Sequence, residues 1–252
     1  MDMGWGMRWI GLAAVLLAMA ACAPVPGAPT GARGSARMVQ PAPDPGPLRT
    51  PEQAASAFAF VVSRVETVAE GVCRARTRNV PCDFQIVLDT RGGQAPNAFQ
   101  TLDSRGRPVI GLTYSLLEHA RNVDELAFVL GHETSHHILG HILRQRETAR
   151  KGAVLAGVLA EMGGADARTV RSMQEMGASL SARSFSKEFE LEADALGTEI
   201  TIAAGYDPVH GAQFFMRLPD PGNKVLGSHP PNARRIAVVR QTAQRLGYVS
   251  TH

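Results

Sequence analysis

The chain has 252 residues, of which 44% are hydrophobic and 19% are charged, and its formal net charge is +3. These values are typical of a globular protein, so they exclude a wholly disordered chain, a collagen and a coiled-coil rod. The basic residues are scattered and form no run that could follow a phosphate backbone. We therefore expect no nucleic-acid partner.

The N-terminus is predicted to be an export signal. Arg8 supplies a positive charge, and the apolar run from Trp9 to Met19 is too short for a transmembrane helix, which needs about 20 residues. The run ends in Met19-Ala20-Ala21-Cys22, which resembles the lipobox of bacterial lipoproteins, where the cysteine becomes the lipidated first residue. Residues 1–21 then form a lipoprotein signal peptide. Cleavage by an ordinary signal peptidase after Ala20 would instead leave Cys22 as a free thiol.

Residues 22–51 are predicted to be a disordered tether. Between Ala23 and Pro51 lie eight of the 16 prolines and four glycines, so this stretch cannot bury enough apolar surface to fold. Because Ala23, and not an aspartate, follows the lipobox cysteine, the resemblance favours the outer membrane. We expect an exported protein, lipid-anchored to the outer membrane and facing the periplasm, with residues 52–252 as its folded domain.

Two further cysteines agree with an oxidising compartment. Cys73 and Cys82 flank eight residues, and in the periplasm such a pair would close a small loop as a disulfide. The alternative is a pair of reduced cysteines that never meet.

The folded part is predicted to be α+β and mainly helical. Apolar residues at helical spacing predict a helix over Pro51–Gly71, and alternating or β-branched runs predict strands at Asp83–Asp89, Ala98–Leu102 and Pro108–Leu112. The chain beyond is almost wholly helical, which places a small β-sheet beside a helix bundle. The apolar segment Ala153–Met162 is either a membrane or partner contact or a buried helix end.

Two histidines lie on one face of a predicted helix, which begins after a capping residue, Asn122, with Glu125 completing a capping box. The stripe comprises Phe128, Val129, His132, His136, Leu139 and Leu143. Imidazoles four residues apart on such a face can bind one Zn²⁺ ion. Glu133 lies one position further round, in the pattern HExxH, where its carboxylate can act on the attacking water without ligating the metal. The alternative is a pair of buried histidines without a metal.

The third metal ligand distinguishes the classes of zinc peptidase. Leu139 and Ile142 stand where a metzincin needs a glycine and a histidine, so that class is excluded. A glutamate from a later helix is the other solution. The candidates are Glu188, Glu190 and Glu192.

Helical geometry favours Glu190. The apolar face of this later helix comprises Phe185, Phe189, Ala193, Leu196 and Ile200, and one flank comprises Glu190, Asp194, Gly197 and Thr201. On that flank Gly197 permits another backbone to approach closely, whereas the acids of the opposite flank are interpreted as solvated (Glu188, Glu192 and Glu199). We therefore predict Glu190 as the ligand, with Asp194 orienting a ligand histidine.

Together these motifs resemble metallopeptidase family M48, the gluzincins that include the HtpX heat-shock protease and the CAAX prenyl proteases. The likeness is closer to its soluble, lipoprotein or periplasmic bacterial branch and covers about residues 52–246. It rests on Asn97-Ala98-Phe99, on Asp124 to His136, on Glu190 to Asp194, and on Ser228-His229-Pro230-Pro231 with Arg235-Ile236.

The resemblance implies a zincin-like domain with Glu133 as general base and one Zn²⁺ ion bound by His132, His136 and Glu190. In relatives a histidine of the His-Pro segment lies near the zinc, where it steadies the oxyanion or blocks the open coordination site. The corresponding residue here is His229, for which a plain loop histidine is the alternative. His137 and His141 point away from the ligand stripe and are interpreted as structural.

The activity that the resemblance implies is that of a zinc metalloendopeptidase, a hydrolase acting on misfolded or misassembled polypeptides of the cell envelope. The strand containing Asn97, Ala98 and Phe99 is expected to be an edge to which an extended substrate adds. The alternative function is an outer-membrane assembly or chaperone-like factor that binds polypeptides with little or no proteolysis.

Overall fold

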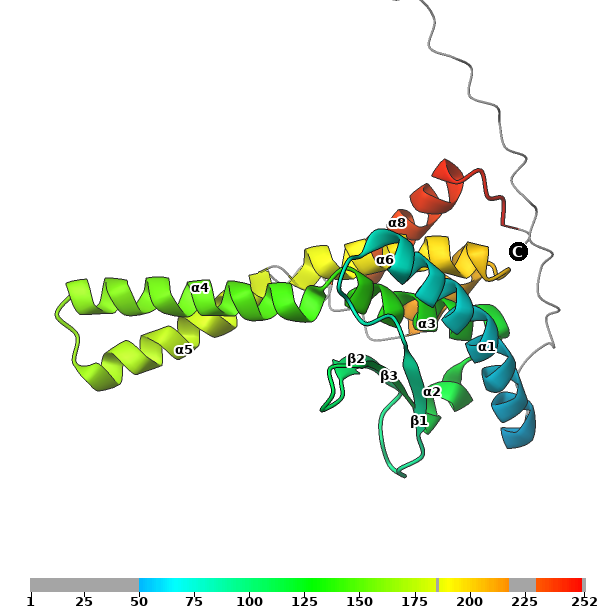
Figure 1. Cartoon of the computed structure of the whole chain (residues 1–252), viewed down its shortest axis with the longest axis horizontal. Helices are drawn as coiled ribbons and strands as arrows, with labels where there is room; N and C mark the ends of the chain where they lie inside the picture. The colour runs from blue at the N-terminus through cyan, green and yellow to red at the C-terminus, as the bar shows by residue number, and fades with distance from the viewer. Residues whose placement is uncertain (1–49, 185, 218–229, 251–252) are drawn as a thin grey trace, which may run out of the picture. The chain divides into compact units, whose positions relative to one another are not determined.

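The computed structural model describes residues 50–184, 186–217 and 230–250 (Figure 1). The predicted signal peptide, Cys22, nearly all of the tether, Phe185 and His229 lie outside these residues. The elements in chain order are α1 (Pro51–Arg76), β1 (Gln85–Asp89), β2 (Ala98–Leu102), β3 (Pro108–Thr113), α2 (Tyr114–His119), α3 (Val123–Ile138), α4 (His141–Met162), α5 (Ala167–Ser184), α6 (Ser186–Ala203), α7 (Pro208–Gly211), the 3-10 helix η1 (Ala212–Arg217) and α8 (Asn232–Arg245).

The fold is the mainly helical α+β arrangement that the sequence predicts. Within the described ranges the strands form a three-stranded sheet in the order β1-β3-β2, with β3 parallel to β1 and antiparallel to β2. β2 has its predicted bounds, β1 begins two residues later than predicted, and β3 continues one residue further, to Thr113. β2 therefore forms one edge of this sheet.

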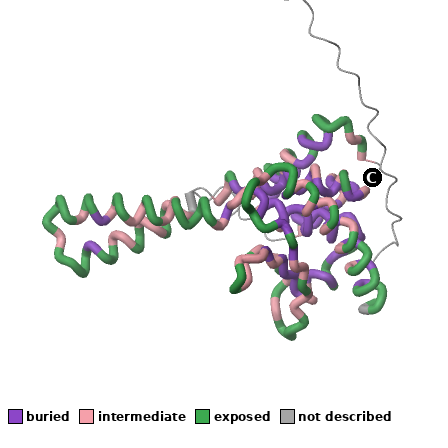
Figure 2. Tube along the Cα trace, in the orientation of Figure 1, coloured by how far each residue is buried: buried purple, intermediate pink, exposed green. Residues whose placement is uncertain are grey.

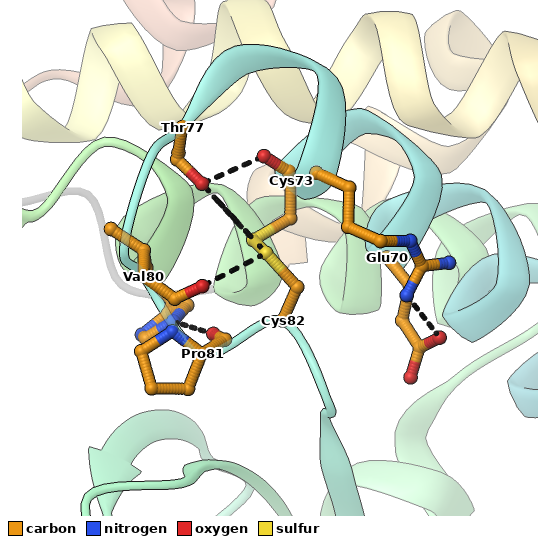
Figure 3. Close-up of a disulfide and its surroundings, with 8 residues drawn as sticks. Glu70, Cys73, Thr77, Val80, Pro81 and Cys82 are labelled. Carbon is orange, nitrogen blue, oxygen red and sulfur yellow. Dashed lines mark hydrogen bonds and ion pairs between the residues drawn. A yellow bond between two sulfur atoms is a disulfide. The ribbon is translucent and has the colours of Figure 1, made fainter.

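The helix α1 extends beyond its predicted end at Gly71. Its buried face continues to the last turn, because fully buried residues recur at every fourth position (Val61, Val65, Ala69 and Cys73). Figure 3 shows the disulfide between Cys73 and Cys82, whose Cα atoms lie 5.7 Å apart. This bond ties the end of α1 to the segment that leads into β1.

The central helix is α3, which packs against α1, α6 and β2. Asn122 caps it as predicted, with its side-chain oxygen accepting from the backbone N–H of Glu125 at 2.9 Å. The Glu125 carboxylate does not close the expected capping box, since it accepts from the N–H of Arg121 and pairs with the Arg217 guanidinium. Burial explains the difference, because a carboxylate in a residue that is 1% exposed requires a charged partner.

The helices α3 and α6 approach closely at two glycines. A Cβ atom on Gly197 of α6 would lie 2.9 Å from the backbone nitrogen of His132, and one on Gly131 of α3 would lie 2.9 Å from the Gly197 carbonyl oxygen. Any larger residue would have to displace backbone atoms. The two glycines therefore set the helices at the separation that places α6 beside the histidines of α3.

The helix α3 ends earlier than its apolar stripe suggests. It stops at Ile138, Gly140 adopts a left-handed conformation with φ of +67°, and α4 begins at His141. Leu143, which was predicted on the buried stripe, is therefore 64% exposed. The periodicity of one helix does not carry across such a break.

The helices α4 and α5 pack against each other as a helical hairpin (Figure 1), and most of their residues are exposed or half-buried (Figure 2). The segment Ala153–Met162 lies in α4, and its large side chains are exposed, so the alternative of a buried helix end is wrong. None of the described helices combines the length and the apolarity needed to cross a bilayer.

Replacing Gly197 with alanine is expected to lower the free energy of unfolding by about 1–3 kcal/mol, because the added methyl group overpacks the contact between α3 and α6. The matched control is Gly71→Ala on α1, where a Cβ atom meets nothing within 4 Å, and where alanine is expected to be neutral or slightly stabilising. Thermal unfolding followed by circular dichroism measures both. Equal melting temperatures for the two variants would contradict the close crossing.

Candidate metal centre

Three side chains converge between α3 and α6. His132 Nε2 lies 3.0 Å from His136 Nε2, and the Glu190 carboxylate oxygens lie 3.6 Å from the first nitrogen and 3.4 Å from the second. A tetrahedral zinc ion with ligands at about 2.0–2.1 Å places neighbouring ligand atoms about 3.3 Å apart. The three separations fit that geometry, and two imidazoles with one carboxylate are a donor set that zinc accepts.

His132 is oriented through its other ring nitrogen. Its Nδ1–H donates to Asp194 Oδ1 at 2.9 Å, because a carboxylate can only accept, and this leaves the Nε2 lone pair directed at the centre. The fully buried Asp194 also receives two hydrogen bonds from Arg235, at 2.7 and 2.8 Å. Burial raises the pKa of Asp194, but Arg235 and His132 outweigh it and hold the pKa below its usual value.

His136 is oriented by a second chain of hydrogen bonds. Its Nδ1 lies 2.8 Å from Nδ1 of His141, and Nε2 of His141 lies 3.1 Å from the Glu192 carboxylate. Burial lowers the pKa of His141, so this ring is neutral, and it donates to Glu192 while accepting from His136. The Nε2 lone pair of His136 is thereby left for the centre.

Two sequence-based interpretations need correction here. His141 does not point away from the ligands, and Glu192 is not simply solvated, because it pairs with His141 and with Arg144. The reason is the helix break at Gly140. Because His141 belongs to α4, the periodicity of α3 does not determine the direction in which its side chain points. Stacking of His141 on the Phe189 ring, with centroids 4.5 Å apart, fixes the imidazole in this place.

Arg235 lies at the candidate centre, although the sequence assigned it no role. Its guanidinium lies 3.5 Å from the Phe215 ring centroid and 3.6 Å from a Glu190 oxygen, as well as on Asp194. One buried cation thus offsets the charge of the acids around the centre. The sequence did contain a hint of its importance, because Arg235-Ile236 is among the motifs that resemble family M48. That motif did not indicate which residues Arg235 contacts.

Glu133 lines two hollows, and His136 and Glu190 line both of them as well. Strand β2 contributes to both hollows, through Ala98 and the preceding Asn97 in one and through Gln100 in the other. The base predicted from the HExxH pattern therefore lies beside an edge strand.

Two other predicted residues lie elsewhere. Phe99 turns to the opposite face of the sheet, where its ring covers Gly111 of β3. His137 bonds to the Pro81 carbonyl oxygen at 2.6 Å and contacts the edge of the Phe84 ring, which is the environment of a structural residue. His229 is among the residues that the structure does not describe.

Removing the His141 imidazole is expected to weaken zinc binding by about 10–100-fold, because it no longer orients His136. Titration of His141→Ala against a chromogenic chelator measures this affinity. Glu192→Gln should shift it in the same direction by a smaller factor, and His119→Ala, a substitution on the exposed end of α2, should leave it unchanged. Wild-type affinity in both of the first two variants would contradict the proposed orientation of His136.

Comparison with known proteins is consistent with this centre. The model of Peptidase family M48 matches residues 60–243. The chain is 29% identical over 130 residues to the mitochondrial metalloendopeptidase OMA1 of Arabidopsis thaliana, covering 50% of this chain and 26% of that protein. It is 28% identical over 145 residues to the beta-barrel assembly-enhancing protease of Escherichia coli (strain K12), covering 52% and 30%.

The beta-barrel assembly-enhancing protease of Yersinia pestis gives a longer match, with 29% identity over 192 residues, 69% of this chain and 37% of that protein. The chain thus spans between 26% and 37% of the length of these relatives. The family model, by contrast, covers more than half of the chain. The resemblance seen in the sequence motifs is confirmed, and the chain belongs to peptidase family M48.

Proposed function

We propose that this protein is a zinc-dependent endopeptidase. The observation that carries the proposal is the meeting of His132, His136 and Glu190 at separations that suit one tetrahedral ion, with Glu133 in the adjoining hollows. Membership of family M48 supports the same chemistry. The named relatives include a metalloendopeptidase and proteases, which are further support.

Zinc bound by these three side chains would act as a Lewis acid toward the scissile carbonyl group and would lower the pKa of the attacking water to about 7. Glu133 accepts the proton from that water and passes it to the nitrogen of the leaving amine. Asp194 and His141 hold the two imidazoles in place during the reaction. Arg235 keeps Asp194 ionised.

Strand β2 is proposed to bind the substrate as an added strand. In the ladder with β3, Asn97 is hydrogen-bonded to Thr113, so alternation turns the backbone N–H and C=O groups of Ala98 and Gln100 to the outer edge. Each of these two residues also lines one of the hollows that Glu133 lines. An extended peptide paired to this edge would run past the general base.

The substrates are proposed to be misfolded or misassembled proteins of the cell envelope. Support comes from the predicted export signal and lipid anchor at Cys22, and from the beta-barrel assembly-enhancing proteases among the relatives. The protein would then act at the outer membrane, on the periplasmic side. An edge strand that reads backbone groups suits unfolded polypeptides, because it recognises no particular side chain.

A chaperone-like assembly factor is the second candidate function. The words "assembly-enhancing" in the names of two relatives favour it, and so does an edge strand able to bind an unfolded chain without cleaving it. The intact set of Glu133 and three metal-binding side chains favours the enzyme.

Glu133→Gln is expected to reduce hydrolysis of unfolded casein by about 100–10,000-fold, because it keeps the shape of the side chain and removes the proton acceptor. Its zinc content should equal that of the wild type. Glu188→Gln, at an exposed position of α6, is the matched control and should keep the wild-type rate. Unchanged turnover by Glu133→Gln would exclude this residue as the base, whereas an inactive variant that still corrects an envelope defect in cells would favour the assembly factor.

Ala98→Pro is expected to lower kcat/KM for an unfolded substrate by about 3–10-fold, since it removes one outward N–H donor and leaves the ladder between β2 and β3 intact. Ala98→Val keeps the donor and is the control. Steady-state kinetics on a fluorogenic peptide measure both variants. Equal values of kcat/KM would contradict strand addition at this edge.

A further inference from the structure

The second half of α4 carries a stripe of large apolar side chains that the rest of the described chain leaves in solvent. Val154, Leu155, Val158, Leu159 and Met162 are 61%, 62%, 47%, 59% and 81% exposed. Their spacing places them on one face of the helix. A contiguous exposed patch of this kind is costly in water and marks an interaction surface.

The hairpin packs through small residues. A Cβ atom on Gly177 of α5 would lie 2.4 Å from the carbonyl oxygen of Gly152 on α4, and one on Gly157 would lie 2.6 Å from the Gln174 amide. The two backbones therefore meet directly, and the large aliphatic side chains of α4 face outwards. Helices that pack in lipid show the same pattern, with small residues at the helix–helix contact and large apolar residues on the outer faces.

The outer face of α4 changes from charged to apolar along the helix. Its first half carries Arg150 and Lys151, with Lys151 paired to Glu147, and the stripe begins at Val154 and is bordered in its last turn by the exposed Glu161. The start of α5, which follows the stripe in the chain, adds the exposed Arg168 and Arg171. Over residues 141–184 the chain has seven basic and four acidic residues, so the hairpin is positively charged overall.

The length of the apolar part limits how it can meet a bilayer. Residues 152–162 rise by about 16 Å as a helix, which is about half of a hydrocarbon core of about 30 Å. Such a segment is too short to cross the bilayer, in agreement with the lack of a spanning helix among the described residues, so its apolar face can lie only along the surface, within one leaflet. Long basic side chains at its boundary can reach the phosphate groups.

We propose that the α4–α5 hairpin is a membrane-docking element that places the side chains of the stripe (Val154, Leu155, Val158, Leu159 and Met162) in one leaflet of a bilayer containing anionic lipids. The cationic residues on either side of the stripe contact the headgroups. The charge of the hairpin and its packing through glycines favour lipid over a protein partner. The lipid anchor predicted at Cys22 would bring the domain to such a surface, and insertion of the hairpin does not depend on it.

The test places an environment-sensitive nitrobenzoxadiazole label in the stripe. The full chain carrying Cys22→Ser and Leu159→Cys offers one reactive thiol, because Cys73 and Cys82 form a disulfide. The matched control carries the label at Val249→Cys, a position outside the hairpin that is 80% exposed. Both proteins share the same N-terminus, so any binding through residues 1–49 is common to them.

With vesicles of phosphatidylethanolamine and phosphatidylglycerol, we expect the Leu159 label to shift to shorter wavelength and to be quenched by lipids that carry a doxyl group in the acyl chain. The Val249 label should respond to neither, and vesicles of phosphatidylcholine alone should give a several-fold weaker response at the stripe. A Leu159 label that stays in water, as the Val249 label does, would overturn the proposal. Shielding without vesicles that grows with protein concentration would also overturn it, in favour of a second copy.

Discussion

The close crossing of α3 and α6 is the contact on which the site depends. His132 and His136 lie one turn apart on α3, so the helix itself brings them together. Glu190 belongs to α6 and reaches the histidines only if the two backbones nearly touch. Gly131 and Gly197 permit that approach, with a hypothetical Cβ atom on either lying 2.9 Å from a backbone atom. The approach of Glu190 to the two histidines therefore depends on two residues without side chains.

Burial of charge is the second constraint. Asp194 is fully buried, and it remains ionised because Arg235 donates to both of its oxygens and His132 donates to one. On the other side, Glu192 accepts a hydrogen bond from His141, and His141 in turn is hydrogen-bonded to His136 and fixes its orientation. Each of the two imidazoles is thus held by its distal nitrogen against a carboxylate, directly or through one ring, so the arrangement exists before any substrate binds.

Local patterns were enough to predict much of this structure. Strand β2, the HExxH pair and the flank of Glu190 all follow from residues within a few positions of one another. His141 could not be placed, because a left-handed glycine at position 140 separates it from the helix whose periodicity was used. Arg235 could not be placed either, because it meets Asp194 across 41 residues of sequence and no periodicity relates α8 to α6.

The metal content of the purified chain tests the central claim most directly. Wild-type protein is predicted to hold one zinc ion per chain, measured by atomic emission after dialysis against metal-free buffer. Glu190→Ala should lose it, and Glu188→Ala, which alters an exposed side chain of the same helix, should retain it. Full zinc occupancy in Glu190→Ala would contradict the three-ligand centre, because the carboxylate of α6 would then not complete the site.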